Sequence, residues 1–297
     1  MSKRQINKRY RFIRFIVLCI IVNIAIIVLI GNNKSVSDKN NPIEIKEEEE
    51  YIKTNKSNLL ENKKGKEIKK DSKEKVEKEE VKKQEKNNDS VLRVSVEEAY
   101  LNDERKIAFL TFDDGPSNNT IKILEILNQK NVKATFFVLG ELAEKNDKII
   151  KDIYKQGHSI GNHTYSHEYN KIYASTDNLL NDISKTNNIL KNIIGKDYNS
   201  RLFRFPGGSF GEKKSLFRKA VVNNGYSYID WNALNRDSEG NYKNSNELLF
   251  HIKDTVKGKK RVVILMHDSA AKKSTVESLP QTIDYLKSEG YEFGILE

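Results

Sequence analysis

Residues 97–297 are predicted to form an α/β domain built on a parallel sheet, either open or closed into a barrel. Two observations predict this class. Short apolar runs rich in Val, Ile and Phe alternate with segments of helical periodicity, and Gly157, Gly225 and Gly290 each follow one of these segments. Strands that alternate with helices pair in parallel, and their carboxyl ends are where sites are built.

The predicted elements follow one another without long interruptions. Seven runs have the length and composition of strands: Ile107–Phe112, Thr135–Leu139, Ser159–Asn162, Leu202–Phe205, Ser227–Trp231, Val262–Met266 and Glu292–Ile295. The segments between them have the spacing of amphipathic helices: Thr120–Gln129, Glu141–Lys155, Thr176–Ile194, Lys213–Asn223, Ser245–Val256 and Thr275–Ser288.

Residues 15–30 form an apolar run without a charged residue. With Phe12 and Ile13 it approaches the roughly 19 residues that span a hydrocarbon core of about 30 Å. The preceding residues 1–14 carry six basic residues and no acidic one, and flanks rich in Lys and Arg stay in the cytoplasm. We therefore predict a cytoplasmic tail (1–14) and an uncleaved transmembrane anchor (15–30). A cleaved signal peptide is the alternative, although Leu29–Asn33 lacks the small residues of a cleavage site.

Residues 31–96 consist mainly of Lys, Glu, Asn and Ser. Such a composition buries too little apolar surface to offset the entropy of the chain. We predict a charged, disordered linker that separates the anchor from the folded domain. The protein would then span the membrane once, with its N-terminus inside the cell and the domain outside.

The net charge of +10 first suggests a nucleic-acid partner. The basic and acidic residues number six and none in 1–30, 17 and 15 in 31–96, and 29 and 27 in 97–297. The excess therefore belongs mainly to the N-terminal flank, and we predict no nucleic-acid partner. The single cysteine, Cys19, excludes a disulfide framework and a thiolate zinc site. We expect the folded domain to be monomeric.

Unusual polar residues lie at the predicted strand ends. Asp113 and Asp114 close the first strand, and two adjacent carboxylates there are hard to explain by packing, although Asp-Asp-Gly-Pro is also good turn chemistry. His163 and His167 follow the third strand. Two imidazoles four residues apart, together with one carboxylate, make a three-ligand metal site with an open position.

Two further strand ends carry candidate residues. Arg204 precedes Pro206-Gly207-Gly208 after the fourth strand, and glycines let backbone N–H groups approach a ligand closely. His267 ends the sixth strand and would face the same edge as the two aspartates. The other two histidines, His158 and His251, are interpreted as structural or solvent-facing.

Taken together, these motifs resemble a known family. TFDDGP, HTYSH, RFPGG, the Trp231–Asp237 segment and LMH occur in the order and spacing of the NodB-type polysaccharide deacetylases, carbohydrate esterase family 4. The resemblance covers residues 97–297. It implies a distorted (β/α) barrel of about seven parallel strands, which agrees with the seven strands counted above.

The resemblance also implies a role for each residue at the first strand ends. Asp113 would be the catalytic base. Asp114, His163 and His167 would bind a divalent metal ion, with Zn²⁺ expected and Co²⁺, Mn²⁺ or Ni²⁺ as alternatives. Arg204 would pair with Asp113, and such a partner should lower the pKa of that carboxyl.

The later motifs imply the remaining roles. His267 would be the general acid, and Asp237 would pair with it and raise its pKa. The N–H of Gly207, where many relatives carry an aromatic residue, would donate to the oxyanion. Leu265 would line the acetyl pocket and Trp231 the substrate pocket.

These roles predict a metal-dependent hydrolase that removes N-acetyl groups from an extracytoplasmic amino-sugar polymer and releases acetate. Peptidoglycan N-acetylglucosamine in the cell wall is the first expectation. Chitin oligomers, a biofilm glucosamine polymer and acetylated xylan are alternatives. A wall-binding protein without activity is the non-enzymatic alternative, which Ser238 keeps open because it stands where the family has Trp.

Overall fold

The computed structural model describes residues 91–297. The predicted tail, the predicted anchor and all but the last six residues of the predicted linker lie outside this range. Within it, no helix has both the length and the apolar character that a membrane crossing requires.

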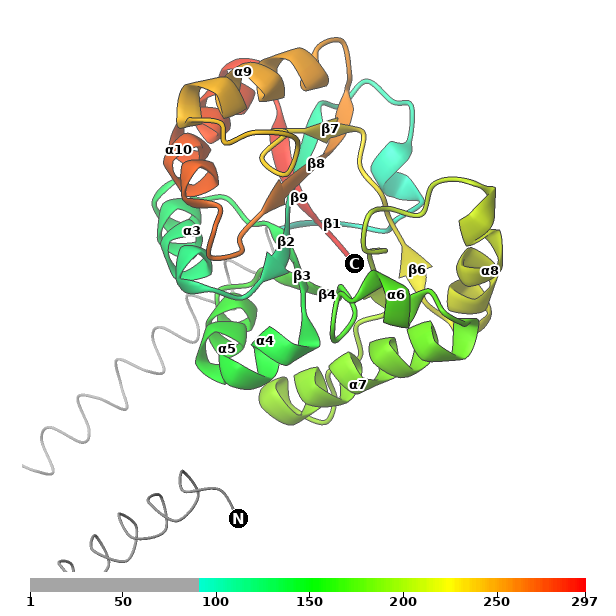
Figure 1. The fold of residues 1–297 in the computed structure, drawn as a ribbon. Coiled ribbons are helices and arrows are strands. Elements are labelled where there is room, and N and C mark those ends of the chain that lie inside the picture. The colour runs from blue at the N-terminus through cyan, green and yellow to red at the C-terminus, as the bar shows by residue number, and fades with distance from the viewer. Residues whose placement is uncertain (1–90) are drawn as a thin grey trace, which may run out of the picture. The chain divides into compact units, whose positions relative to one another are not determined.

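Nine strands and the helices between them make up the described chain (Figure 1). The strands are β1 (Leu92–Val94), β2 (Ile107–Gly115), β3 (Thr135–Val138), β4 (Ser159–Asn162), β5 (Leu202–Phe203), β6 (Ser227–Tyr228), β7 (Ala233–Leu234), β8 (Arg261–His267) and β9 (Glu292–Leu296). The α-helices are α3 (Asn118–Gln129), α4 (Gly140–Lys145), α5 (Asp147–Lys155), α6 (Tyr169–Ile172), α7 (Thr176–Ile194), α8 (Ser215–Asn223), α9 (Ser245–Val256) and α10 (Lys273–Ser288). Two short 3₁₀ helices are η1 (Glu98–Tyr100) and η2 (Glu212–Lys214).

The sheet is parallel throughout and branches at β2. β8 pairs with β2 from Ile107 to Asp113, whereas the other edge of β2 is shared. β9 pairs with its first half and β3 with its second half. One path of the sheet therefore runs β7-β8-β2-β3-β4-β5-β6 and contains seven strands.

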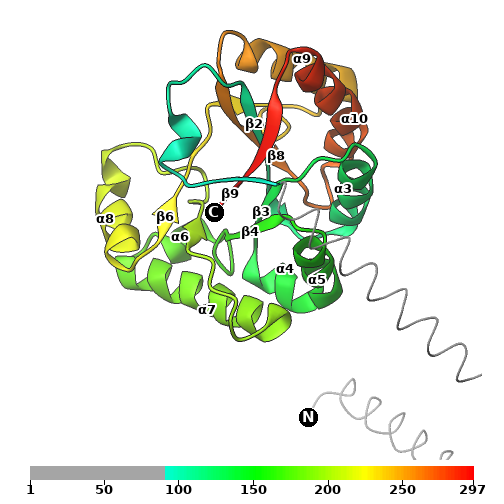
Figure 2. The ribbon, with the colours of Figure 1, turned by 180° about the vertical axis from the view of Figure 1, so that it is seen from behind.

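These seven strands form a distorted half-barrel. Among the described residues no ladder joins β6 to β7, so the ring is not closed by hydrogen bonds. Figures 1 and 2 show the helices around the outside of the sheet. The parallel α/β class is confirmed, and the barrel that the resemblance implied is an open one.

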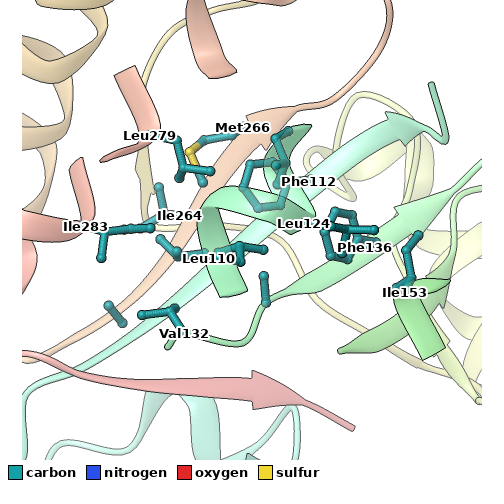
Figure 3. Packing of buried hydrophobic residues seen from close by; sticks show 14 of the residues in the cluster. Leu110, Phe112, Leu124, Val132, Phe136, Ile153, Ile264, Met266, Leu279 and Ile283 are labelled. Carbon is teal, nitrogen blue, oxygen red and sulfur yellow. The ribbon is translucent and has the colours of Figure 1, made fainter. Parts of the chain in front are cut away.

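The two faces of β2 divide the barrel into an outer and an inner side. Leu110 and Phe112 point outward into the main core, with Ile264 and Met266 of β8 and Leu279 of α10 (Figure 3). The alternate residues point inward, because successive side chains of a strand face opposite sides. Phe109 packs with β1 and the end of β9 in a second cluster, and Thr111 and Asp113 follow it along the same face. The inner side is therefore apolar near the strand starts and polar at the carboxyl ends.

The structure differs from the prediction at three points. The folded domain begins by Leu92 and not at residue 97, because β1 pairs with β9. The predicted helix Glu141–Lys155 is two helices, α4 and α5, separated at Asn146. β7 was not predicted, because Ala233 and Leu234 are an isolated apolar pair between two asparagines, and β1 has only three residues.

Candidate active site

Side chains from the carboxyl ends of five strands meet at the mouth of the half-barrel. Asp113 and Asp114 lie at the end of β2, His163 and His167 after β4, Arg204 after β5, Asp237 after β7 and His267 at the end of β8. Parallel pairing makes Asp113 and His267 direct register partners on neighbouring strands. The structure thus brings together the residues that the motifs singled out.

Asp113 and Arg204 form a buried ion pair, with 3.0 Å between Arg204 Nη1 and Asp113 Oδ1. Both side chains are almost fully buried. Burial raises the pKa of Asp113 above its ordinary value, and the Arg204 guanidinium opposes this shift. Arg204 does act to lower this pKa, as expected, but the loss of solvent outweighs the pairing and the net shift is upward.

Arg204 also donates hydrogen bonds to groups other than Asp113. Its Nη1 also donates to Thr111 Oγ1 at 2.6 Å, and its Nε and Nη2 donate to the carbonyls of Ile229 and Asp230 at 3.0 and 3.2 Å. A fully buried guanidinium needs such partners for each N–H. The ion pair is thereby fixed to three strand ends.

The atoms of a three-ligand metal site converge beside this pair. Asp114 Oδ1 lies 3.5 Å from the Nε2 atoms of both His163 and His167. Ligands at about 2.1 Å from a tetrahedral ion lie roughly 3.4 Å apart, so the separation fits. Asp114 Oδ1 is also buried without a hydrogen-bond partner among the described residues, which a bound cation would supply. The residues present therefore fit a divalent metal ion.

The histidine loop, residues 163–167, is held by groups behind it. His163 Nδ1 lies 2.8 Å from the Arg204 carbonyl, so this nitrogen carries the proton and Nε2 keeps its lone pair for a metal. Burial lowers the pKa of His163 to about 3, which keeps the imidazole neutral. Asp182 Oδ2 accepts from the backbone N–H groups of Tyr165 and Ser166 at 2.7 and 2.9 Å.

Three residues at this mouth also have strained backbone conformations. Asp114, Thr164 and His167 have φ of 70°, 71° and 57°, in the left-handed region that non-glycine residues rarely adopt. Strain of this kind persists where the surrounding structure enforces it, commonly at functional sites.

On the opposite side of the mouth, His267 is bound by Asp237. His267 Nδ1 lies 2.7 Å from Asp237 Oδ1, and the His267 backbone N–H donates to Asp237 Oδ2 at 2.9 Å. Burial disfavours the charged imidazole, but the hydrogen bond and charge of Asp237 outweigh it and raise the pKa of His267 to about 9. The pair predicted from the sequence is present, and it keeps Nε2 of His267 protonated at neutral pH.

Known proteins are similar to this chain in sequence and in fold. Residues 101–229 match the model of the family described as polysaccharide deacetylase. A peptidoglycan-N-acetylglucosamine deacetylase of Bacillus cereus is 34% identical over 193 residues, which cover 64% of this chain and 69% of that protein. A solved structure of a Streptococcus mutans esterase of carbohydrate esterase family 4 has a TM-score of 0.65 and 32% identity, over 71% of this chain and 94% of that one.

The chain belongs to the polysaccharide deacetylase family. A Bacillus anthracis protein described as a pseudoenzyme of the same esterase family also matches, with a TM-score of 0.56 and 28% identity over 65% of this chain and 64% of that one. In the present chain the paired carboxylates, the two imidazoles and the His267–Asp237 pair are all in place. With its deacetylase relatives, this makes it a deacetylase-type hydrolase.

Gly207 of this deacetylase lies against Tyr169, the first residue of α6. Its φ is 70°, and a Cβ atom added there would meet the Tyr169 hydroxyl at 2.7 Å. The Tyr169 ring packs edge-on against His167, with 5.3 Å between the ring centroids. The space that an aromatic residue at position 207 would need is therefore partly taken by Tyr169.

The predicted substrate pocket residues lie on the inner side of the half-barrel. Leu265 is two residues before His267 on β8 and shares its face. The Trp231 ring lies 6.0 Å from the Arg204 guanidinium and packs edge-on against Phe210, which is 58% exposed. Trp231 and Phe210 thus form an aromatic edge beside the ion pair.

The deacetylase also has polar residues near the site that no sequence signal identified. Asp268 is buried below Gly115 and accepts from Thr120 Oγ1 at 2.5 Å. Burial raises its pKa to about 7. Asp230 accepts from the backbone N–H and hydroxyl of Ser209 at 2.8 and 2.6 Å. Asp230 stands inside the predicted strand Ser227–Trp231, and no feature of the sequence distinguishes it as a site residue.

The two remaining histidines differ from each other. His158 is buried and accepts a hydrogen bond at Nδ1 from the backbone N–H of Ala134, at 3.1 Å. Burial lowers the pKa of His158 to about 3, so it is a structural residue, as one of the two interpretations held. His251 lies in α9, one of the helices on the outside of the sheet (Figure 1).

Proposed function

We propose that this protein hydrolyses N-acetyl groups of an extracytoplasmic amino-sugar polymer, with peptidoglycan N-acetylglucosamine as substrate. One observation carries the proposal. The buried carboxylate of Asp113 and the protonated imidazole of His267 lie side by side on adjacent strands, next to three converging metal ligands. Amide hydrolysis needs these functions together: a base for water, an acid for the leaving amine and stabilisation of negative charge.

Asp114, His163 and His167 would hold the metal ion. One carboxylate and two imidazoles suit Zn²⁺, with Co²⁺, Mn²⁺ and Ni²⁺ as alternatives. When bound, a divalent cation polarises the acetyl carbonyl and makes a water molecule more acidic.

The residues of the chain then carry the proton transfers. Asp113 takes the proton from the attacking water, and its raised pKa makes it a stronger base than an ordinary carboxylate. The N–H of Gly207 donates to the carbonyl oxygen as its negative charge grows. His267 is charged at neutral pH and gives its Nε2 proton to the leaving amine, so that acetate and a free amino sugar result.

The choice of polymer rests on the relatives and on the predicted topology. Relatives of about one-third identity include peptidoglycan-N-acetylglucosamine deacetylases of Bacillus cereus and Listeria monocytogenes. The predicted anchor and linker would place the domain outside the membrane. A flexible linker of this length averages roughly 40 Å from end to end, at about 5–6 Å times the square root of the residue number. That reach suits a wall-bound glycan.

Acetate release tests the activity directly. The purified protein, supplied with Zn²⁺, should release acetate from N-acetylglucosamine oligomers and from peptidoglycan. His163→Ala should abolish the reaction, whereas the matched variant His251→Ala should leave it unchanged because this histidine lies in α9. Mass analysis of wall fragments before and after treatment would identify the sugar. A metal-bound wild-type protein that is inactive on every N-acetylated glycan would overturn the proposal.

A further inference from the structure

The loop from Pro206 to Gly211, here called the glycine loop, leads from β5 towards η2 and α8. Its glycines at 207, 208 and 211 have φ of 70°, 77° and 81°, which glycine adopts without steric cost. Four carbonyl groups of the loop accept hydrogen bonds from two cationic side chains: Lys214 binds those of Pro206 and Gly208, and Arg218 binds those of Ser209 and Gly211. The carbonyl side of the loop therefore faces α8.

Lys214 is the cation next to Gly207. Its Nζ donates to the carbonyl of Pro206 at 2.9 Å, to that of Gly208, and to the Tyr173 hydroxyl at 3.2 Å. The Tyr173 hydroxyl in turn donates to the Pro206 carbonyl at 2.7 Å. One carbonyl oxygen thus accepts from both an ammonium and a phenol.

The N–H groups of the glycine loop have different partners. Gly208 donates to the Phe205 carbonyl at 2.8 Å, and Ser209 donates to Asp230 Oδ1 at 2.8 Å. The Gly207 N–H has no acceptor within residues 91–297. Since C=O and N–H of a trans peptide point in opposite directions, this N–H points away from Lys214 and Tyr173.

We propose that Lys214, together with Tyr173, polarises the Pro206–Gly207 peptide and aims its N–H at the acetyl oxygen of the substrate. Lys214 is then a positioning residue that acts on the reaction only through the Gly207 N–H. The inference rests on the proposed function, because it assigns this N–H to the oxyanion.

The surroundings of Lys214 favour this role over a simple ion pair. Within residues 91–297, no carboxylate lies within ion-pair distance of its Nζ, so its charge is directed at carbonyl oxygens. The side chain is also partly buried, where a charge acts on its neighbours more strongly than it does in water. An ammonium on the carbonyl oxygen withdraws electron density from the amide and makes its N–H a stronger donor.

Three variants separate polarisation from loop stability. Lys214→Met removes the charge and keeps the aliphatic stem, and Lys214→Arg keeps the charge. Arg218→Met is the matched control, because Arg218 holds the same loop through carbonyls whose peptides do not include the Gly207 N–H. We expect kcat on an N-acetylglucosamine oligomer to fall about tenfold in Lys214→Met, a part of the roughly 10²–10³ lost with a whole oxyanion donor.

The pattern across variants decides the result. KM, zinc affinity and melting temperature should stay near wild type in Lys214→Met, Lys214→Arg should recover most of kcat, and Arg218→Met should keep kcat within about twofold of wild type. An equal fall in kcat for Lys214→Met and Arg218→Met would overturn the inference and indicate loop stability alone. A wild-type kcat in Lys214→Met would overturn it as well.

A second measurement does not depend on activity. The NMR signal of the Gly207 amide should move upfield in Lys214→Met, as the N–H loses polarisation, and stay in place in Arg218→Met. An unchanged signal in Lys214→Met would overturn the polarisation. If the wild type hydrolyses no glycan, the proposed function fails, and this signal still shows whether Lys214 polarises the peptide.

Discussion

The two sides of the active-site mouth are built alike and behave differently. On one side the carboxylate of Asp113 pairs with Arg204, and on the other the imidazole of His267 pairs with Asp237. Burial works against the charged form in both pairs. It prevails at Asp113, whose pKa is raised, and it is overcome at His267, whose pKa is raised to about 9 by its partner.

The distribution of each partner's hydrogen bonds explains the difference. Arg204 shares its N–H groups among Asp113, the Thr111 hydroxyl and two backbone carbonyls. Asp237 instead places one oxygen on His267 Nδ1 and the other on the His267 backbone N–H and the Thr275 hydroxyl, so in the described part of the chain His267 is its only charged partner. A shared charge stabilises one partner less than a concentrated charge does. Both outcomes serve the proposed reaction, since a base needs a high pKa and an acid needs its proton at neutral pH.

The largest expected effect is the loss of the base. Asp113→Asn should lower kcat for acetate release by about 10²–10⁴, the range typical of a removed general acid or base. Zinc affinity, measured by calorimetry, should stay within severalfold of wild type, because the ligands are Asp114, His163 and His167. A variant that keeps its kcat would show that Asp113 is only the partner of Arg204.

The next effect concerns stability. Arg204→Met should lower the free energy of unfolding by roughly 3–5 kcal/mol, because it leaves the buried Asp113 carboxylate without its cation. Urea denaturation would measure it. The matched change on the exposed pair, Arg105→Met, should have a much smaller effect, since that arginine pairs with Glu292 in solvent. Similar losses in both variants would contradict the buried character of the first pair.

The role of His267 as the acid predicts how kcat/KM depends on pH. His267 must be protonated to act, so kcat/KM should fall as pH rises through about 9, the pKa of His267. Asp237→Asn removes the partner that raises this pKa, and the alkaline limb should move down by about 2 units or more, towards or below the ordinary value of 6.5. The raised pKa also contributes stability that is full below pH 6.5 and lost as pH rises through about 9. If kcat/KM of Asp237→Asn fell at the same pH as that of the wild type, the alkaline pKa would belong to another group.

The sequence predicted the positions of these residues better than their properties. Asp113, His163 and His267 could be placed at one edge because each directly follows a predicted strand. The raised pKa of Asp113 could not be predicted, since it depends on burial that only the folded barrel produces. The resemblance supplied the pairing of His267 with Asp237, which lie 30 residues apart with no local pattern to join them.

For the glycine loop, the sequence predicted only that a backbone N–H could approach a ligand closely there. Lys214 stands in a stretch that reads as the start of an ordinary amphipathic helix. Its three hydrogen-bond partners come from the loop and from Tyr173, 41 residues earlier, and no periodicity marks them. The same limit applies to β1 and β7, because strands of three and two residues acquire their order from the neighbours they pair with.

The smallest expected effect tests how Asp237 raises the pKa of His267. Either the charge of Asp237 is sufficient, or the hydrogen bond that holds Asp237 in place is needed as well. Thr275 Oγ1 donates to Asp237 Oδ2 at 2.7 Å. Thr275→Val should cost about 1.5 kcal/mol of unfolding free energy, as for a lost hydrogen bond to a charged group, and should move the alkaline limb by less than about 0.5 unit. Asp237 stays ionised without this donor, because His267 still lowers its pKa.

Ser278→Ala is the matched control for that change. Ser278 is buried on the same helix, and its hydroxyl donates to the neutral backbone carbonyl of Thr275 at 3.0 Å. Its stability cost should be smaller, about 1 kcal/mol, with no shift of the limb. If Thr275→Val moved the limb down by a unit or more, the raised pKa of His267 would depend on how Asp237 is held. The Asp237–His267 pair would then differ from the Arg204–Asp113 pair in how rigidly the charged partner is held, and not in how its charge is shared.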